Sequence, residues 1–261
     1  MRSLQRIHLM TIAVVAGTLV ATGASATIIG NWDGSARSWN SGDATILHDL
    51  MTSRGHTVEA DGALTAANLA GDTLFVIGEA TRATTAAETA DLLSYVMSGG
   101  RLLITVDTFG SSIGTGVANG NAILSSLGSS LTFSTALGAS AVNGALQAGN
   151  FLTEGGPFDI VGQTLSVSPG VAVTGGTALA GSYVAFEQIG AGYIFGFADN
   201  FQNDIFLNSA ANVNGQMHIN LVEGGAVTQV PEPSALVLLG LGLLTLALFA
   251  KRTKHSVRLS I

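Results

Sequence analysis

The sequence predicts an exported domain of the α/β class, in which helices cover both faces of a mostly parallel sheet. Apolar segments of strand length alternate with amphipathic segments of helical length, and the apolar segments are continuous rather than alternating. Strands of that kind are buried on both faces, as in parallel sheets joined by right-handed helical crossovers. The charged and strongly apolar segments at the two chain ends stand outside this pattern.

The first half of the domain supplies four expected strands and two helices. The first helix places Leu47, Leu50 and Met51 on one face before Gly55 ends it. The second opens with the capping-box pattern Thr85-Ala86-Ala87-Glu88 and ends at Gly99. The strands are residues 27–30, 56–60, 73–77 and 101–106, and the first helix spans residues 44–54.

The stretch over residues 107–190 is rich in Gly, Ser, Thr and Ala, which predicts an irregular, β-rich insertion. Regular order returns after it, where a Gly190-Ala191-Gly192 turn suits a hairpin. The expected elements are a helix over residues 121–127, strands over 164–167 and 171–174, hairpin strands over 183–188 and 193–198, and a closing helix around 215–223.

Three parts of the domain carry a resemblance to a known group: Gly55-His56-Thr57-Val58, residues 92–96 with 99–104, and residues 192–199. With them the domain resembles the class I glutamine-amidotransferase-like or flavodoxin-like domains, which are three-layer folds of the Rossmann type. The resemblance implies that catalytic members carry a cysteine after the central strand. This chain has no cysteine at all, so amidotransferase activity is excluded.

The first 26 residues have the features of a signal peptide. Arg2 and Arg6 precede an apolar stretch at residues 12–20, and Ala24-Ser25-Ala26 fits the small-residue cleavage rule. We therefore expect the mature chain to begin at Thr27.

Residues 234–250 contain no charge, and a helix of that length spans about 25 Å, barely enough to cross a bilayer. Lys251 and Arg252 follow at once, and basic residues stay on the cytoplasmic side. This pattern predicts a transmembrane helix with the domain on the far side of the membrane.

The order Val230-Pro231-Glu232-Pro233-Ser234, apolar helix and basic end resembles the PEP-CTERM sorting signal of Gram-negative bacteria. The resemblance implies processing by an exosortase near Pro231, Glu232 and Pro233 and delivery to the cell surface or the exopolysaccharide matrix. The predicted organisation is a signal peptide (1–26), an exported domain (27–229) and a sorting signal (230–255). An ordinary single-span anchor is the alternative.

Composition limits the partners of the exported domain. It carries 16 acidic residues against four arginines and no lysine, so nucleic acid is not expected as a partner. The lack of cysteine excludes disulfide scaffolds and thiolate metal sites.

Four acidic residues follow expected strands, at the edge where open parallel sheets bind ligands: Asp33, Glu79, Asp107 and Asp199. Carboxylate oxygens suit a hard cation, which makes calcium the only cofactor that the sequence suggests. The alternative is that each acid caps a following helix or turn.

An enzymatic alternative rests on residues 110–114, which match the Gly-x-Ser-x-Gly nucleophile elbow. Ser112, Asp199 and His218 then follow in the order of an α/β-hydrolase triad. Such a match arises easily by chance in a chain rich in glycine and serine, and several residues separate Ser112 from its strand.

Trp32 and Trp39 lie in the polar loop after the first strand, where their rings offer stacking surfaces for sugars or serve as lids over the sheet edge. We therefore expect a non-enzymatic binding or structural protein of the exopolysaccharide layer, with exosortase, the membrane and exopolysaccharide as partners. An extracytoplasmic serine hydrolase is the alternative.

Overall fold

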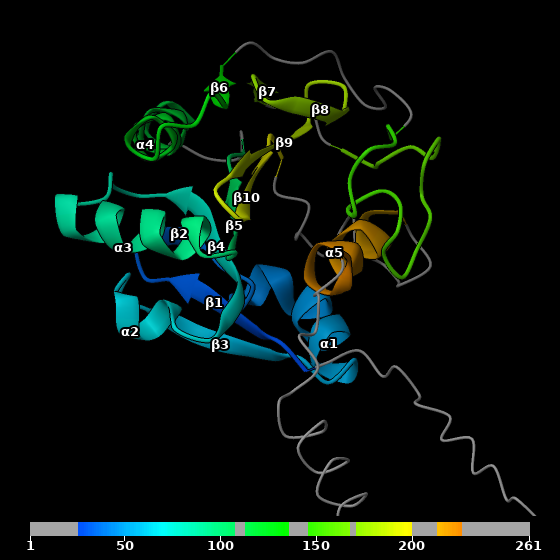
Figure 1. Cartoon of the computed structure of the whole chain (residues 1–261), viewed down its shortest axis with the longest axis horizontal. Coiled ribbons are helices and arrows are strands. Elements are labelled where there is room, and N and C mark those ends of the chain that lie inside the picture. Colours follow the sequence, from blue (N-terminus) through cyan, green and yellow to red (C-terminus); the bar gives the residue numbers. More distant parts are fainter. Residues whose placement is uncertain (1–25, 108–112, 136–145, 168–170, 200–212, 226–261) are drawn as a thin grey trace, which may run out of the picture.

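The computed structural model describes residues 26–107, 113–135, 146–167, 171–199 and 213–225, which form a three-layer α/β domain (Figure 1). Its central sheet has the strand order β3-β1-β4-β5-β10-β9-β8, and β2 pairs with β4 beside this path. The first five strands of the order are parallel, whereas β9, β8 and β2 are antiparallel to their neighbours. The predicted mixed α/β class with a mostly parallel sheet is confirmed.

Most strands lie close to their predicted positions, and the hairpin of β9 and β10 turns where the sequence places it. The strands are β1 (Ile28–Trp32), β2 (Ser35–Arg37), β3 (Thr57–Gly62), β4 (Asp72–Ala80), β5 (Arg101–Thr105), β8 (Thr177–Ala180), β9 (Val184–Ile189) and β10 (Gly192–Phe197).

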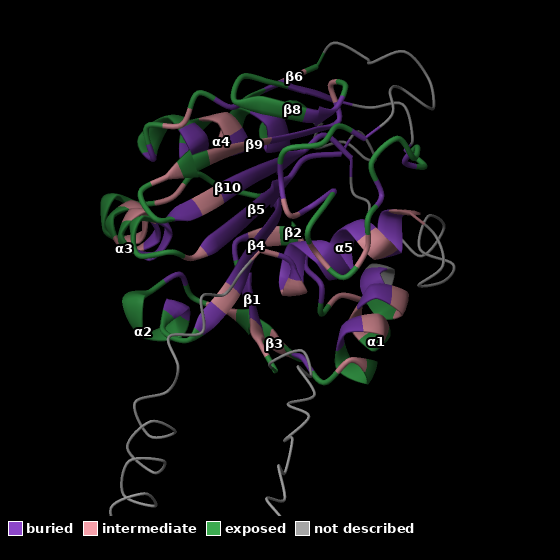
Figure 2. Cartoon of the chain, turned by 45° about the vertical axis from the view of Figure 1, so that its right-hand side comes forward, coloured by how far each residue is buried: buried purple, intermediate pink, exposed green. Residues whose placement is uncertain are grey.

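Helices cover both faces of the sheet (Figure 2). On one face lie α2 (Ala66–Leu69), α3 (Ala86–Met97) and α4 (Ile113–Ser126), and on the other lie α1 (Thr45–Ser53) and α5 (Val213–Glu223). A short 3₁₀ helix (Gly42–Ala44) precedes α1. Every residue of β5 is buried between the two helical layers, which is the physical reason for its continuous apolar sequence.

Local signals explain where the helices begin and end. Thr85 and Glu88 form the predicted reciprocal capping box at the start of α3. At the end of α1, Gly55 has a positive φ of 88°, and the N–H of His56 reaches back to the carbonyl of Met51. Glycine adopts this left-handed conformation without strain, and so it ends the helix.

The glycine-rich insertion differs from the prediction. Helix α4 begins well before residue 121, and Gly116 and Gly120 lie within it. A Cβ at Gly120 would come within 3.2 Å of Val106, so glycine lets this helix approach the end of β5 closely. Packing therefore outweighs the low helix propensity of glycine.

The predicted strand at residues 164–167 is irregular, whereas the one at 171–174 is confirmed as β7 (Ala172–Thr174). It pairs with β6 (Thr132–Ser134) in a separate two-stranded sheet.

Polar side chains join the first described residues to the end of α5. The hydroxyl of Thr27 lies 2.9 Å from Nδ1 of His56, and Nε2 of His56 lies 2.9 Å from Oε1 of Glu223. Arg54 donates to both carboxylate oxygens of Glu223. Burial alone raises the pKa of Glu223, but the hydrogen bonds from Arg54 and His56 outweigh it and lower that pKa below its usual value.

Across the described ranges, every helix is too short or too polar to cross a bilayer. The predicted signal peptide (1–26) lies outside the described residues except for Ala26, and the predicted transmembrane helix (234–250) lies wholly outside them.

Candidate functional site

The carboxyl edge of the sheet carries the four predicted cation ligands, each directly at or after a parallel strand. Asp33 is exposed, whereas Glu79, Asp107 and Asp199 are buried. Glu79 forms an ion pair with Arg37, in which Nε and Oε1 are 3.1 Å apart. Among the described residues, no three His, Cys, Asp or Glu side chains form a group that could hold a metal ion. These four acids therefore do not come together as such a group, and a calcium site at this edge stays a prediction.

The two tryptophans belong to the core. Trp32 and Trp39 both have 0% exposure, the guanidinium of Arg82 lies 4.7 Å from the Trp32 ring centroid, and Trp39 meets His218 edge-on. A stacking platform for a sugar needs an open ring face, so the predicted glycan contact at these residues is wrong. Burying two indole rings is strongly favourable, and this outweighs the polar character of the neighbouring residues.

His218 has no role as the base of a triad in this structure. Its ring is buried between Trp39 and Phe197, and Nδ1 bonds the carbonyl oxygen of Asn214 on the same helix at 2.7 Å. In a catalytic triad the acid lies at this nitrogen, which in His218 contacts a main-chain carbonyl instead. Burial lowers the pKa of His218 to about 4. Ser112 lies outside the described residues.

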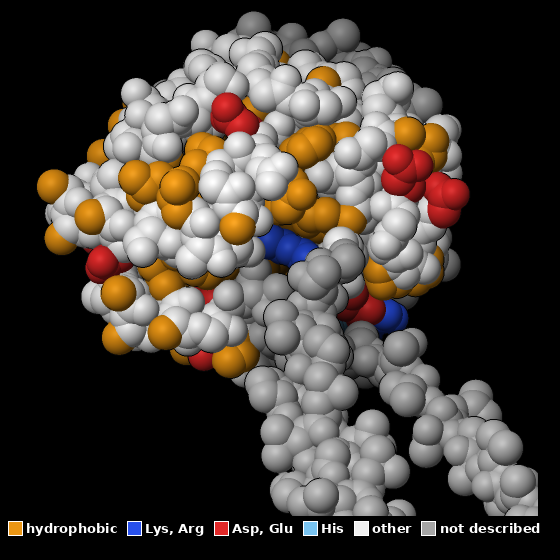
Figure 3. All heavy atoms as spheres, viewed as in Figure 1, with side chains coloured by type: hydrophobic (Ala, Val, Ile, Leu, Met, Phe, Trp, Pro, Cys, Tyr) orange, Lys and Arg blue, Asp and Glu red, His pale blue; other side chains and the backbone are white. Residues whose placement is uncertain are grey.

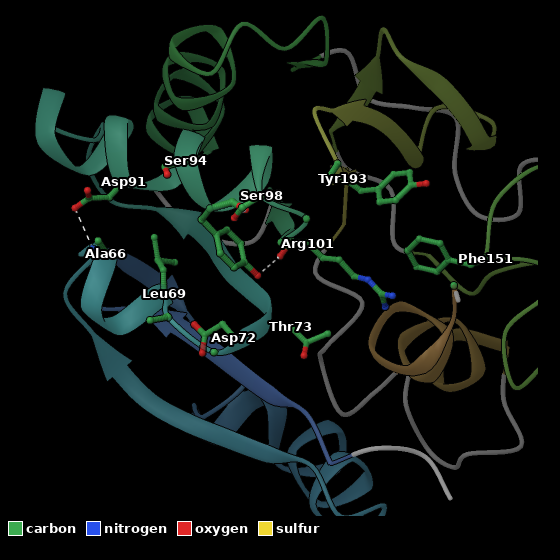
Figure 4. Close-up of a pocket in the computed structure, with 17 residues that line it drawn as sticks. Ala66, Leu69, Asp72, Thr73, Asp91, Ser94, Ser98, Arg101, Phe151 and Tyr193 are labelled. Atoms are coloured by element: carbon green, nitrogen blue, oxygen red, sulfur yellow. Dashed lines mark hydrogen bonds between the residues drawn. The ribbon is translucent and has the colours of Figure 1, made fainter. Parts of the chain in front are cut away.

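The structure places a cavity of about 960 Å³ at the opposite, amino-terminal edge of the sheet (Figure 4). It runs from α2 and α3, past the first residues of β4, β5 and β10, to Phe151 and Gly225. Figure 3 shows that hydrophobic and uncharged groups prevail on one face of the molecule, with few charged groups among them. The lining includes hydroxyl, carboxyl, guanidinium and aromatic groups: Asp72, Asp91, Ser94, Tyr95, Ser98, Arg101, Phe151 and Tyr193.

Asp72, the first residue of β4, is the most unusual group in this lining. The ladder between β1 and β4 pairs Ile28 with Asp72 but Ile29 with Leu74, so β4 has one extra residue at this point. This bulge puts the Asp72 side chain beside Gly30, where a Cβ would collide with its carboxylate. Glycine at position 30 therefore makes the room that this carboxyl occupies.

The Asp72 side chain is 9% exposed, and within the described part of the chain its buried Oδ2 atom has no hydrogen-bond partner. Burial, together with the nearby charge of Glu59, raises the pKa of Asp72 to about 7. A buried carboxyl without a partner is costly to the fold, and such groups concentrate at ligand-binding and catalytic sites.

Tyr95 of α3 connects the Asp72 side of the cavity to β5. Its hydroxyl donates to the carbonyl oxygen of Arg101 at 3.0 Å, and its ring packs edge-on against Phe75. Burial raises the pKa of Tyr95, with a smaller effect from Asp72, so the hydroxyl keeps its proton.

Arg101 stands at the other side of the cavity, where it closes the carboxyl end of α5. Its Nη1 atom donates to the carbonyls of Leu221 and Val222 at 2.6 and 3.0 Å, and Nη2 donates to that of Gly224. The guanidinium also lies 4.3 Å from the Phe151 ring centroid. Burial lowers the pKa of Arg101 to about 10, and it stays charged at neutral pH. A cation at this point satisfies the free carbonyls and the dipole of the helix.

The rings near Arg101 form an aromatic wall. Phe151 meets Tyr193 and Phe195 edge-on, with centroids 5.3 and 5.7 Å apart, and Phe151 and Tyr193 are half-buried. The cavity thus combines an aromatic surface at one side with an unpartnered carboxyl at the other.

The sequence did not predict this cavity, because ligands in open parallel sheets are expected at the carboxyl edge. A signal for it exists in the sequence: Asp72 and Arg101 are charged residues that open two otherwise apolar strands. A charge at a strand's first residue is normally a solvated end, and only the bulge and Gly30 turn Asp72 inward.

No curated protein matches the sequence. The structure titled mmIFT52 N-terminal domain has a TM-score of 0.54 and 16% identity, and the match covers 74% of this chain and 94% of that one. Cytoplasmic protein STM1381 from Salmonella typhimurium LT2 has a TM-score of 0.52 and 13% identity, with 76% and 100% covered. At these identities the likeness concerns the fold alone.

Two family matches characterise the chain itself. Residues 229–252 match the PEP-CTERM protein-sorting motif, which confirms the signal predicted around Pro231, Glu232 and Pro233 and makes this an exosortase-sorted surface protein. Residues 44–237 match a family described as a domain of unknown function, DUF4350. Because this match covers most of the sequence, the chain belongs to the DUF4350 family.

Proposed function

We propose that this exosortase-sorted surface protein has a non-enzymatic role in the exopolysaccharide layer, where its domain binds a polysaccharide segment in the cavity at the amino edge. The observation that carries the proposal is the lining of that cavity. The half-buried rings of Phe151 and Tyr193 lie at one side of the cavity, and hydroxyl and carboxyl groups line the rest of it (Figure 4). Sugars present apolar C–H faces and many hydroxyls, so they suit a site that combines rings with a few polar groups.

The protein reaches that layer by export and processing. We propose that the signal peptide is removed before Thr27 and that residues 234–250 hold the precursor in the membrane until exosortase cuts near Pro231–Pro233. The charge pattern of the ends supports this order, since Lys251 and Arg252 keep the extreme carboxyl end cytoplasmic.

Binding is tested with the mature protein recovered from the extracellular fraction of its own cells, titrated with exopolysaccharide from the same cells in a calorimeter. We expect Tyr193→Ala to weaken binding about tenfold, because it removes a ring from the aromatic wall. Asp33→Ala, an exposed acid at the far edge of the sheet, is the matched control and should bind like the natural protein. Absence of any binding by the natural protein would refute the proposed role.

A further inference from the structure

We infer that the cavity selects an uncharged, hydroxyl-rich sugar unit, one hydroxyl of which hydrogen-bonds to the carboxyl of Asp72 in the cavity wall. This inference rests on the proposed function and deepens it, since it names the class of sugar and the residue that holds it. Asp72 is the side chain of the lining that is buried and whose Oδ2 atom, among the described residues, has no hydrogen-bond partner.

The surroundings of Asp72 show that the fold makes room for the carboxyl without satisfying it. The bulge in β4 directs it inward, and Gly30 leaves the space that a side chain would fill. The buried hydroxyl of Tyr95, whose pKa Asp72 also raises, already donates to the Arg101 carbonyl. A ligand hydroxyl that hydrogen-bonds to this carboxyl would offset the cost of burying it without a partner.

Charge decides between classes of sugar. The acidic groups around the position are Glu59 on β3, Asp72 on β4 and Asp91 on α3, and they oppose an acidic sugar. Arg101 is the single basic residue of the lining, and it is engaged by the carbonyls at the end of α5. An anionic ligand would therefore meet the negative charges of Glu59 and Asp91 without a free cation to offset them.

The protonation of Asp72 favours a hydroxyl over an ammonium group. Titratable groups that face it are Glu59 and Tyr95; the former raises its pKa and the latter keeps its own proton. At pH 6 the carboxyl is therefore mostly protonated, and a protonated carboxyl both donates and accepts, as a sugar hydroxyl does. To bind a cationic amino sugar, the carboxyl would have to release its proton, and the ammonium group of the sugar would have to lose its hydration.

The test uses exopolysaccharide from the same cells, hydrolysed to oligosaccharides and separated by ion exchange into neutral, acidic and basic fractions. Each fraction is titrated into the mature protein at pH 6. We expect the neutral fraction to bind most tightly, Asp72→Leu to weaken it at least tenfold, and Asp72→Asn, which keeps a hydrogen-bonding group, to weaken it less. Asp33→Asn changes an exposed carboxylate at the opposite edge of the sheet and should bind within twofold of the natural protein.

Gly30→Ala provides a second variant that leaves Asp72 itself in place. The added methyl group occupies the space of the carboxylate, so the neutral fraction should again bind at least tenfold more weakly. Thermal unfolding of each variant verifies that the domain is folded.

Neutral oligosaccharides that bind Asp72→Leu as tightly as the natural protein would overturn the inference. Preferential binding of the acidic or the basic fraction would do the same, and both results leave the proposed function standing. Binding of none of the fractions by the natural protein would refute the proposed function as well.

Discussion

Asp72 and His218 are both buried titratable side chains, yet their effects on stability run in opposite directions with pH. The folded protein keeps the proton of Asp72 up to about pH 7, whereas an unfolded aspartate loses it near pH 4. The folded protein keeps His218 neutral down to about pH 4, whereas an unfolded histidine binds a proton near pH 6.5. Asp72 and His218 therefore lead to separate predictions for the pH dependence of stability.

For Asp72, the folded state binds more protons between pH 4 and 7, so its contribution to stability falls as pH rises through this window. Asp72→Asn removes that dependence, and we expect the variant to be more stable than the natural protein by about 1–3 kcal/mol at pH 8. Urea unfolding at pH 5 and pH 8 measures the difference. An equal effect of the substitution at both pH values would contradict the assignment.

For His218, the unfolded state binds the additional proton, so its contribution to stability is lost as pH falls from 6.5 towards 4. His218→Phe keeps a ring between Trp39 and Phe197 but cannot titrate. We expect it to abolish a loss of about 2–3 kcal/mol across this window. Unfolding curves at pH 7 and pH 4.5 test this, with His48→Asn on α1 as the control that leaves the loss unchanged.

At the scale of single elements, α3 has the best-defined start. Arg82 donates to both oxygens of Glu88, and the carboxylate in turn accepts from the N–H of Thr85. The hydrogen bond from Arg82 is the main reason that the pKa of Glu88 is lowered to about 2, so the capping group stays ionised. The helix therefore keeps a charged capping group well into the acidic pH range.

Loss of this cap should be measurable. Thr85→Ala removes the acceptor for the N–H of Glu88, and we expect it to lower the free energy of unfolding by about 1 kcal/mol. Thr115→Ala changes an exposed threonine within α4 and should alter stability by less than about 0.5 kcal/mol. Equal effects of the two substitutions in denaturant unfolding would argue against the capping role.

The elements that the sequence predicts well are those with strong local patterns. Strands β4 and β5 are continuous apolar runs, and α3 carries its start signal in Thr85 and Glu88. Helix α2 was missed because four residues carry too little periodicity, and α4 was shortened because glycine is a poor helix former. The resemblance to amidotransferase-like domains stays a prediction.

The site was harder to predict because burial is a tertiary property. Nothing next to Trp32 in the sequence distinguishes a core indole from an exposed one, and the inward turn of Asp72 depends on Gly30, which lies on another strand. The order of strands along the chain is enough to predict the edge of the sheet at which each acid lies. That Oδ2 of Asp72 lacks a partner can be seen only in the packed structure.

At the scale of the whole molecule, the sorting motif governs where the domain ends up. Replacing Pro231 and Pro233 by Ala should prevent processing, so that the protein keeps its carboxyl end through Ile261 and stays with the membrane. The intact mass in membrane and extracellular fractions measures this, against an expected natural product that begins at Thr27 and ends near Pro233. A variant still released at the natural mass would show that cleavage does not need the two prolines.

The hydrogen-bonded cluster of Thr27, His56 and Glu223 holds the first described residues and the end of α5 together at one edge of the sheet. Gly225 lines the cavity at that same edge, and the buried and exposed acids after β1, β4, β5 and β10 lie at the other. A fluorescent reporter joined directly after Gly225 would therefore lie beside the cavity and obstruct it. A label attached at Asp33 would instead report from the far side and leave the cavity open.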